Sequence, residues 1–229
     1  MEMELHHADS HLVSAVMSAD KVRNLEKELR EGVEDPGEYN EIPFSREHSA
    51  MVQSCVMSSF AFLEAFVNET WNLIQNLDEI QPFLSFNNQL SPNNGFTQYS
   101  TLPKYQAILV AGGTEPFPKG EAPFQEVRWL QKLRNYWVHY EPDSVSSEDP
   151  VRESESSLES ALRDRVEPNP KLADSDEAFL PRLAISYDCC TWAIYSAIEF
   201  VEAFRSKVGD RRHLTYLDEV EAILKRDDH

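Results

Sequence analysis

Apolar residues recur at the spacing of an amphipathic helix near the start of the chain, between residues 10 and 31. The repeating positions are Leu12, Val16, Val22, Leu25 and Leu29. The pattern stops at Gly32, a residue type that often follows the end of a helix. The sequence therefore predicts one helix over residues 10–31.

A second apolar segment, over residues 46–80, is apolar on most of its faces. Ser45 can cap its start, and Glu47 suits the positive end of the helix dipole. Pro82 limits its end. Because a helix that is apolar on most sides must be surrounded by protein, this one is predicted to lie at the centre of a helical bundle.

Two further helices are predicted over residues 123–140 and 181–208. The first begins near Pro123, which suits a first helical turn, and ends near Tyr140, because Pro142 disfavours helical geometry at the residue before it. The second carries almost no charge over its first half, so we expect it to be another central helix.

The intervening segments are typical of connections. Residues 83–122 carry Pro and Gly at turn positions and predict at most a short helix at 103–111. Residues 141–177 are acidic and rich in Ser and Pro, and predict a loop with one helical piece at 154–165. A start that resembles a capping box at Thr215 predicts a short last helix.

No segment alternates with the period of a strand, and no internal repeat is present. We therefore expect an all-α fold, an up-and-down helical bundle with long irregular excursions between its core helices. The predicted division is an N-terminal helical extension at residues 1–45 and a bundle at 46–208 that includes the loop 141–177. A short C-terminal helix at 209–229 packs on the same domain.

The chain of 229 residues is strongly acidic, with 40 Asp and Glu against 21 Lys and Arg and a net charge of −19. Its largest basic cluster is the short run from Asp210 to His213, which argues against a general nucleic-acid coat. Any nucleic-acid chemistry must then be confined to a small local site. The chain has no run of 18 apolar residues and no signal-peptide pattern at its start, so we expect a cytoplasmic protein with no membrane partner.

Three cysteines, of which Cys189 and Cys190 are adjacent, do not provide a disulfide framework or the spacing of a metal chelate. We interpret them as small core residues. His7 and His11 stand one helical turn apart, a spacing that can hold a metal, but no third ligand is evident nearby. An exposed N-terminus is the favoured interpretation, and no metal or cofactor is expected.

The predicted helix at 123–140 separates polar from apolar residues around its axis. Its polar stripe consists of Gln125, Arg128, Lys132, Asn135 and His139. Arg134 falls on the apolar half, about 140° around the helix from His139, where an unpaired guanidinium would be costly. Glu64 on the central helix is its expected buried partner. These residues are either a core ion pair beside a surface histidine or the parts of a chemical site.

The stretch from Leu133 to Tyr140, LRNYWVHY, resembles the R-x4-6-H motif of the HEPN superfamily (higher eukaryote and prokaryote nucleotide-binding) of α-helical domains, with a polar residue directly after the arginine. Phe60 to Trp71 looks like the first core helix of that family, with Glu64 and Asn68 at its acidic and amide positions. Cys189 to Phe204 looks like its last core helix. Together these segments span roughly residues 46–208.

The resemblance implies a bundle that often dimerises and, in active members, a metal-independent endoribonuclease that works as a toxin or defence effector. It implies that His139 transfers protons, that Arg134 holds the phosphate, and that Asn135 is an orienting or phosphate-contacting amide. It also implies that Glu64 anchors Arg134 and that Asn68 adds a polar contact. RNA, a second copy of the chain, and an antitoxin or defence-complex protein are the implied partners. The family also contains non-catalytic modules that bind protein or nucleic acid, and this alternative stays open.

Overall fold

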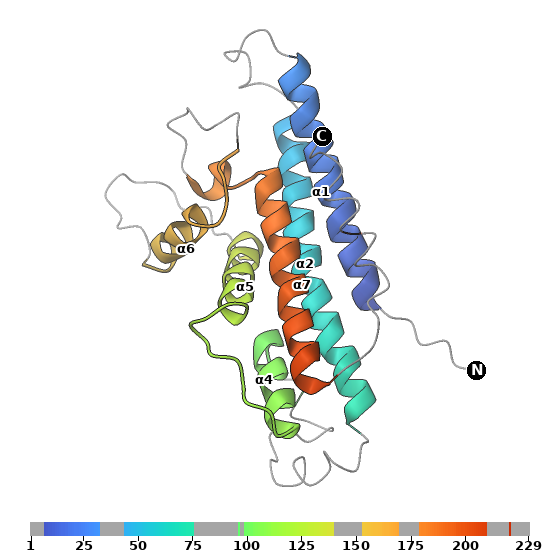
Figure 1. The fold of residues 1–229 in the computed structure, drawn as a ribbon. Helices are drawn as coiled ribbons and strands as arrows, with labels where there is room; N and C mark the ends of the chain where they lie inside the picture. Colours follow the sequence, from blue (N-terminus) through green and yellow to red (C-terminus); the bar gives the residue numbers. More distant parts are fainter. Residues whose placement is uncertain are drawn as a thin grey trace, which may run out of the picture.

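A computed structural model describes residues 7–32, 44–75, 96, 99–139, 153–169, 179–209 and 220. Its elements in chain order are α1 (His7–Gly32), α2 (Phe44–Ile74), α4 (Thr101–Ala111), α5 (Phe124–Val138), α6 (Glu153–Arg163), the π-helical turn η4 (Phe179–Leu183) and α7 (Tyr187–Val208). All of the elements in these described ranges are helical, which confirms the all-α class (Figure 1). The short helices predicted at 103–111 and 154–165 are α4 and α6. The predicted last helix at Thr215 lies outside the described residues.

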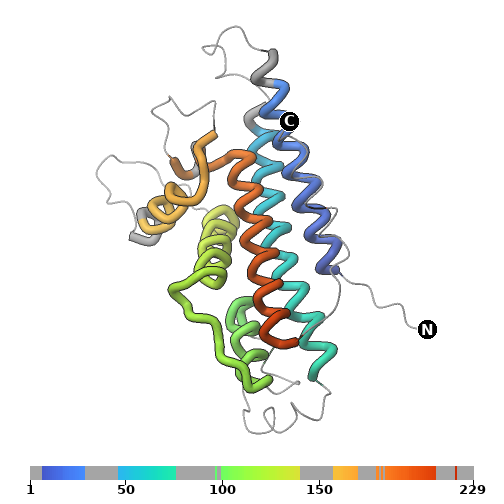
Figure 2. Tube along the Cα trace, viewed as in Figure 1, coloured from blue at the N-terminus to red at the C-terminus, as the bar shows by residue number. Residues whose placement is uncertain are grey.

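Side-chain contacts give the relative directions of the three longest helices, α1, α2 and α7. Hydrogen bonds join Ser18 to Ser54 and Ser58 to Ser14, so α1 and α2 run antiparallel. Cys55 of α2 lies against Cys190 near the start of α7, and Phe66 lies against Phe204 near its end, so these two helices run parallel. Figure 2 shows α1, α2 and α7 side by side, with α5 next to α7 on the side away from α1.

The core is filled with aromatic and aliphatic side chains from every long helix. Tyr105 of α4 is fully buried between the rings of Phe200 and Phe204, at centroid distances of 4.8 Å each. Its hydroxyl donates to the backbone oxygen of Leu63 at 2.8 Å, so the one polar atom of this side chain is satisfied inside the core. Tyr105 therefore fixes the short α4 against both central helices.

The last core helix begins later than predicted, at Tyr187 instead of Pro181. Ser186 is its N-cap, because the Oγ of Ser186 accepts a hydrogen bond from the N–H of Cys189 at 3.2 Å. Upstream of this cap, Leu180 has non-helical backbone angles (φ −102°, ψ 135°), which separates η4 from α7. The apolar pattern continues across the break, because both sides of it are buried, and so the pattern alone did not reveal the break.

α1 belongs to the same core as the helices of the predicted bundle. Its buried residues, among them Leu12, Ala15 and Val22, join the one cluster that also holds the core of α2 and α7. Glu26 near the end of α1 is buried and accepts hydrogen bonds from His48 of α2 and from the backbone of Tyr187. The N-terminal helix is thus integrated with the bundle along its length.

The three cysteines are buried and unbridged, which confirms their interpretation as core residues. Burial raises the pKa of the Cys189 thiol far above its usual range, so this sulfur stays protonated and unreactive at neutral pH. The stretch Arg46–Ile74 of α2 is long and apolar enough to cross a membrane by length and composition, a test that core helices of soluble proteins also pass. Half of its most apolar window is buried by the rest of the protein.

Candidate functional site

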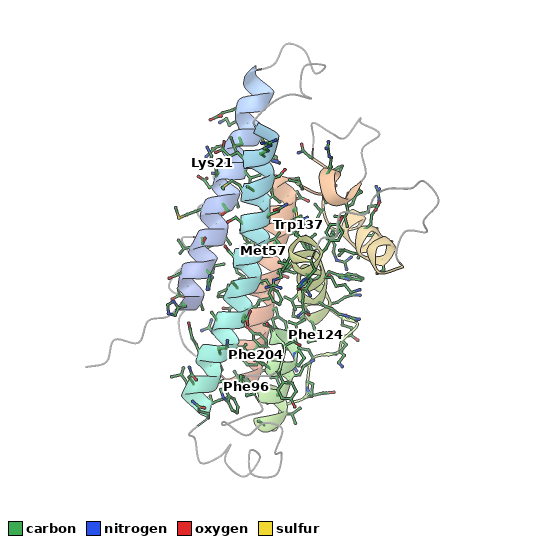
Figure 3. The ribbon with its side chains drawn as sticks, turned by 180° about the vertical axis from the view of Figure 1, so that it is seen from behind. Lys21, Met57, Phe96, Phe124, Trp137 and Phe204 are labelled. Atoms are coloured by element: carbon green, nitrogen blue, oxygen red, sulfur yellow. The ribbon has the colours of Figure 1, made fainter. Side chains whose placement is uncertain are left out.

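The helix that carries the R-x4-H motif is α5, and it is held by an apolar face. Phe124, Val127, Leu130 and Leu133 are buried, at the helical spacing predicted for this face. Phe124 marks one end of α5 and Trp137 the other (Figure 3). The helix ends at Val138, within two residues of the predicted end, and His139 follows as its C-cap.

Glu126, in the first turn of α5, is the polar anchor of this helix. Both of its carboxylate oxygens accept hydrogen bonds from Arg165, at 2.8 and 2.9 Å, and Oε2 also accepts from Nε1 of Trp192 on α7 at 3.1 Å. Although partial burial acts to raise the pKa of Glu126, the hydrogen bonds from Arg165 and Trp192 and the positive charge of Arg165 outweigh it and hold this pKa below its usual range. No sequence pattern indicated this three-way contact, because its members lie far apart in the chain.

We predict that Glu126→Gln lowers the free energy of unfolding by about 1 kcal/mol at pH 7, since glutamine keeps one acceptor oxygen and loses the charge. A pKa that is lowered in the folded state stabilises the protein above the unfolded glutamate pKa of about 4.3. This contribution is lost as the pH falls through the folded value. The free energies of unfolding of wild type and Glu126→Gln, measured in urea, should therefore converge in acid. The variant Glu121→Gln, at an exposed position, should have the free energy of unfolding of wild type at every pH.

Arg134 is half-buried, and its partners differ from the prediction. Its Nη1 donates to Oδ1 of Asn135 at 3.0 Å, and its Cζ lies 5.9 Å from the ring centroid of Phe60 on α2. No ion pair joins Arg134 to Glu64, although the structure describes both side chains. The predicted buried ion pair is wrong. The guanidinium reaches far enough out of the core to keep contact with solvent, and the aromatic face of Phe60 accommodates its inner side.

Glu64 is exposed, and the cation beside it and Asn68 is Lys104 of α4. Nζ of Lys104 donates to Oδ1 of Asn68 at 2.8 Å and lies 5.4 Å from the ring centroid of Phe96. Burial lowers the pKa of Lys104, and the negative charge of Glu64 partly offsets this effect. Glu64 and Asn68 thus interact with Lys104 at the α2–α4 contact and form no ion pair or hydrogen bond with Arg134. The only hint in the sequence was that Lys104 is the one charged residue of its short helix.

His139 lies exposed at the C-terminal end of α5. Its backbone N–H donates to the oxygen of Asn135 at 2.9 Å, so the two residues stand one turn apart as the helical wheel predicted. Among the described residues, no hydrogen bond joins the side chains of His139 and Arg134. At the end of α5, Asn135 therefore contacts Arg134 through its side chain and His139 through its backbone, and the side chains of Asn135 and His139 are exposed.

Two neighbours of this motif change the local surface. Val138 is 47% exposed, a large apolar side chain next to His139 at the end of the helix. The Nε1 of Trp137 is buried without a hydrogen-bond partner in the part of the chain that the structure describes.

Among the described residues, no group of three or more His, Cys, Asp or Glu could hold a metal ion.

No protein-family model matches the chain, and neither the curated proteins nor the solved structures provide a match.

Proposed function

We propose that the protein is a metal-independent endoribonuclease of the HEPN type, with its site at the C-terminal end of α5. The observation that supports this proposal is a hydrogen-bonded pair of polar side chains, Arg134 and Asn135, one helical turn before the exposed His139 at the same end of α5. Among the described residues, no side chain forms a hydrogen bond with the exposed His139, which supports a role in proton transfer. A toxin or defence role fits such an activity.

In the proposed reaction, His139 takes the proton from an RNA 2′-hydroxyl, and the 2′-oxygen attacks the adjacent phosphorus. The bond from phosphorus to the 5′-oxygen then breaks, and that oxygen gains a proton. The products are a 2′,3′-cyclic phosphate and a 5′-hydroxyl. Arg134 stabilises the added negative charge on the phosphorane, and Asn135 orients Arg134 through the hydrogen bond of 3.0 Å.

One protomer supplies one histidine at this helix end, whereas the reaction needs both a base and an acid. A homodimer in which two α5 ends meet would provide two copies of His139. The exposed Val138 beside each histidine offers apolar surface for such a contact. The dimer is thus part of the proposed function.

A non-catalytic HEPN-like module that binds a protein or nucleic acid is the second candidate. The observation in its favour is that no hydrogen bond joins the side chains of Arg134 and His139 within one protomer. An interaction module needs only the surface of α5 and no proton transfer. The two candidates therefore differ in one measurable property, the cutting of RNA.

The deciding experiment incubates the purified protein with total RNA in the presence of EDTA, in ordinary buffer and in high potassium chloride. The proposed enzyme cuts RNA under at least one condition and leaves 2′,3′-cyclic phosphate ends. Intact RNA in all of them, with binding retained, would establish the interaction module instead.

We predict that Arg134→Ala slows RNA cleavage by about 10²–10³-fold, as expected when a group that stabilises transition-state charge is removed. Its stability should change by less than about 1 kcal/mol, because the half-buried Arg134 forms no ion pair with Glu64. Glu64→Gln is the matched control and should cut RNA as fast as wild type. A loss of cleavage in Glu64→Gln would show that Glu64 contributes to the site and would contradict this prediction.

A further inference from the structure

The polar side of α5 carries a pair of cations, Arg128 and Lys132, that form no ion pair with a described carboxylate. Arg128 is exposed and Lys132 half-buried, one helical turn apart on the stripe that continues through Asn135 to His139. The one acidic residue of α5 is Glu126, which is already engaged by Arg165. We call the four residues Arg128, Lys132, Asn135 and His139 the basic stripe of this acidic protein.

Lys132 contacts an aromatic ring and no described carboxylate. Its Nζ lies 4.2 Å from the ring centroid of Trp129, and neither Lys132 nor Arg128 forms an ion pair with a described residue. Burial and the positive charge of Arg128 both lower the pKa of Lys132. Arg163 and Arg205, by contrast, each have a carboxylate beside them. Two adjacent cations without one form a local site for an anion.

The position of this pair relative to His139 indicates which anion it binds. Along the helix axis, Lys132 and Arg128 lie about 10 and 16 Å from His139, at 1.5 Å per residue. That length corresponds to up to about five stacked nucleotides at 3.4 Å each. A polymer with regularly spaced negative charges can therefore occupy His139 and both cations at once, whereas a small anion cannot.

Resting on the proposed function, we propose that Arg128 and Lys132 are positioning residues that bind the phosphates flanking the one cleaved at His139. The RNA strand then lies along the basic stripe of α5, and the strong negative charge elsewhere confines it there. These contacts are the same in substrate and transition state, so they act on binding and not on the chemical step.

The binding test uses a fluorescent 12-nucleotide RNA with 2′-O-methyl groups, which cannot be cut because the attacking hydroxyl is blocked. Arg128→Ala/Lys132→Ala should weaken binding on the order of tenfold and reduce the slope of log affinity against log salt by about 1.4, or 0.7 for each phosphate that the variant no longer binds. The matched control is Lys27→Ala/Arg46→Ala, which removes the same two charges from exposed positions on α1 and α2. It should bind as wild type does. Equal binding by wild type and the stripe variant, or an equal loss in the control, would overturn the proposal.

The kinetic test compares a cleavable 12-nucleotide RNA with a dinucleotide, which is too short to reach Lys132. The stripe variant should raise KM for the long RNA with kcat unchanged and cut the dinucleotide as wild type does. An equal loss on both substrates would indicate a disturbed helix and contradict the positioning role. If neither wild type nor any variant cuts RNA, but the stripe variant alone loses RNA binding, the proposed ribonuclease activity is wrong and the proposed RNA-binding stripe is supported. If wild type cuts RNA and the stripe variant matches it in every measurement, the proposed role of the stripe is wrong and the proposed ribonuclease activity is supported.

Discussion

Replacement of His139 by alanine is expected to reduce RNA cleavage by about 10²–10⁴-fold, the contribution usual for a positioned acid or base. The protein should remain folded, because the side chain is exposed at a helix end and makes no hydrogen bond with another described side chain. A surface change of this kind alters the free energy of unfolding by no more than about 0.5 kcal/mol. The rate of formation of 2′,3′-cyclic phosphate ends measures the effect.

His7→Ala is the matched control, since His7 is an exposed histidine at the start of α1. It should cut RNA at the wild-type rate. Binding of the 2′-O-methyl RNA by His139→Ala should change little, because the flanking phosphate contacts remain. Wild-type cleavage by His139→Ala would contradict the ribonuclease proposal even if RNA binding were retained.

The helices were predictable from the sequence because hydrophobic spacing is a local property. The limits of α5 were set within two residues by Pro123 and Pro142, and the short helices α4 and α6 were found inside the polar connections. The start of α7 was missed because the residues before Tyr187 are as apolar as those after it. A cap formed by one serine is a weaker signal than a continuing apolar pattern.

The candidate site was only partly predictable, because its partners come from different helices. The helical wheel correctly placed Asn135 and His139 one turn apart, since Asn135 lies in the last turn of α5 and His139 is its C-cap. It assigned Arg134 to the core and therefore to Glu64, yet a long arginine side chain can extend from an apolar face toward solvent. The cation beside Glu64 is Lys104, and only the packing of α4 on α2 brings the two together.

A buried carboxylate, that of Glu26, lies at the junction of three helices, α1, α2 and α7. Glu26 of α1 and His48 of α2 are 5% and 3% exposed, and Nε2 of His48 donates to Oε1 of Glu26 at 2.9 Å. That oxygen also accepts the N–H of Tyr187, in the first turn of α7, at 2.8 Å. One carboxylate therefore connects α1, α2 and α7.

Glu26→Ala is expected to lower the free energy of unfolding by about 3–5 kcal/mol, because it leaves the buried His48 and the N–H of Tyr187 without this acceptor. Glu26→Gln retains an acceptor oxygen and should lower the free energy of unfolding by less than Glu26→Ala does, about 1–2 kcal/mol. Glu28→Ala removes the same charge from an exposed position on α1 and should change stability by no more than about 0.5 kcal/mol. Urea unfolding measures all three.

If Glu26→Ala is no less stable than Glu28→Ala, the junction contributes nothing and the prediction is wrong. If the predicted loss is seen, fluorescence and circular dichroism should report it in a single transition, because α1 shares its core with α2 and α7. Separate transitions would instead show that α1 unfolds alone, as an extension would. α2 also supplies Phe60, which contacts Arg134. Glu26→Ala should therefore reduce both the rate of RNA cleavage and the free energy of unfolding. Glu28→Ala should change neither.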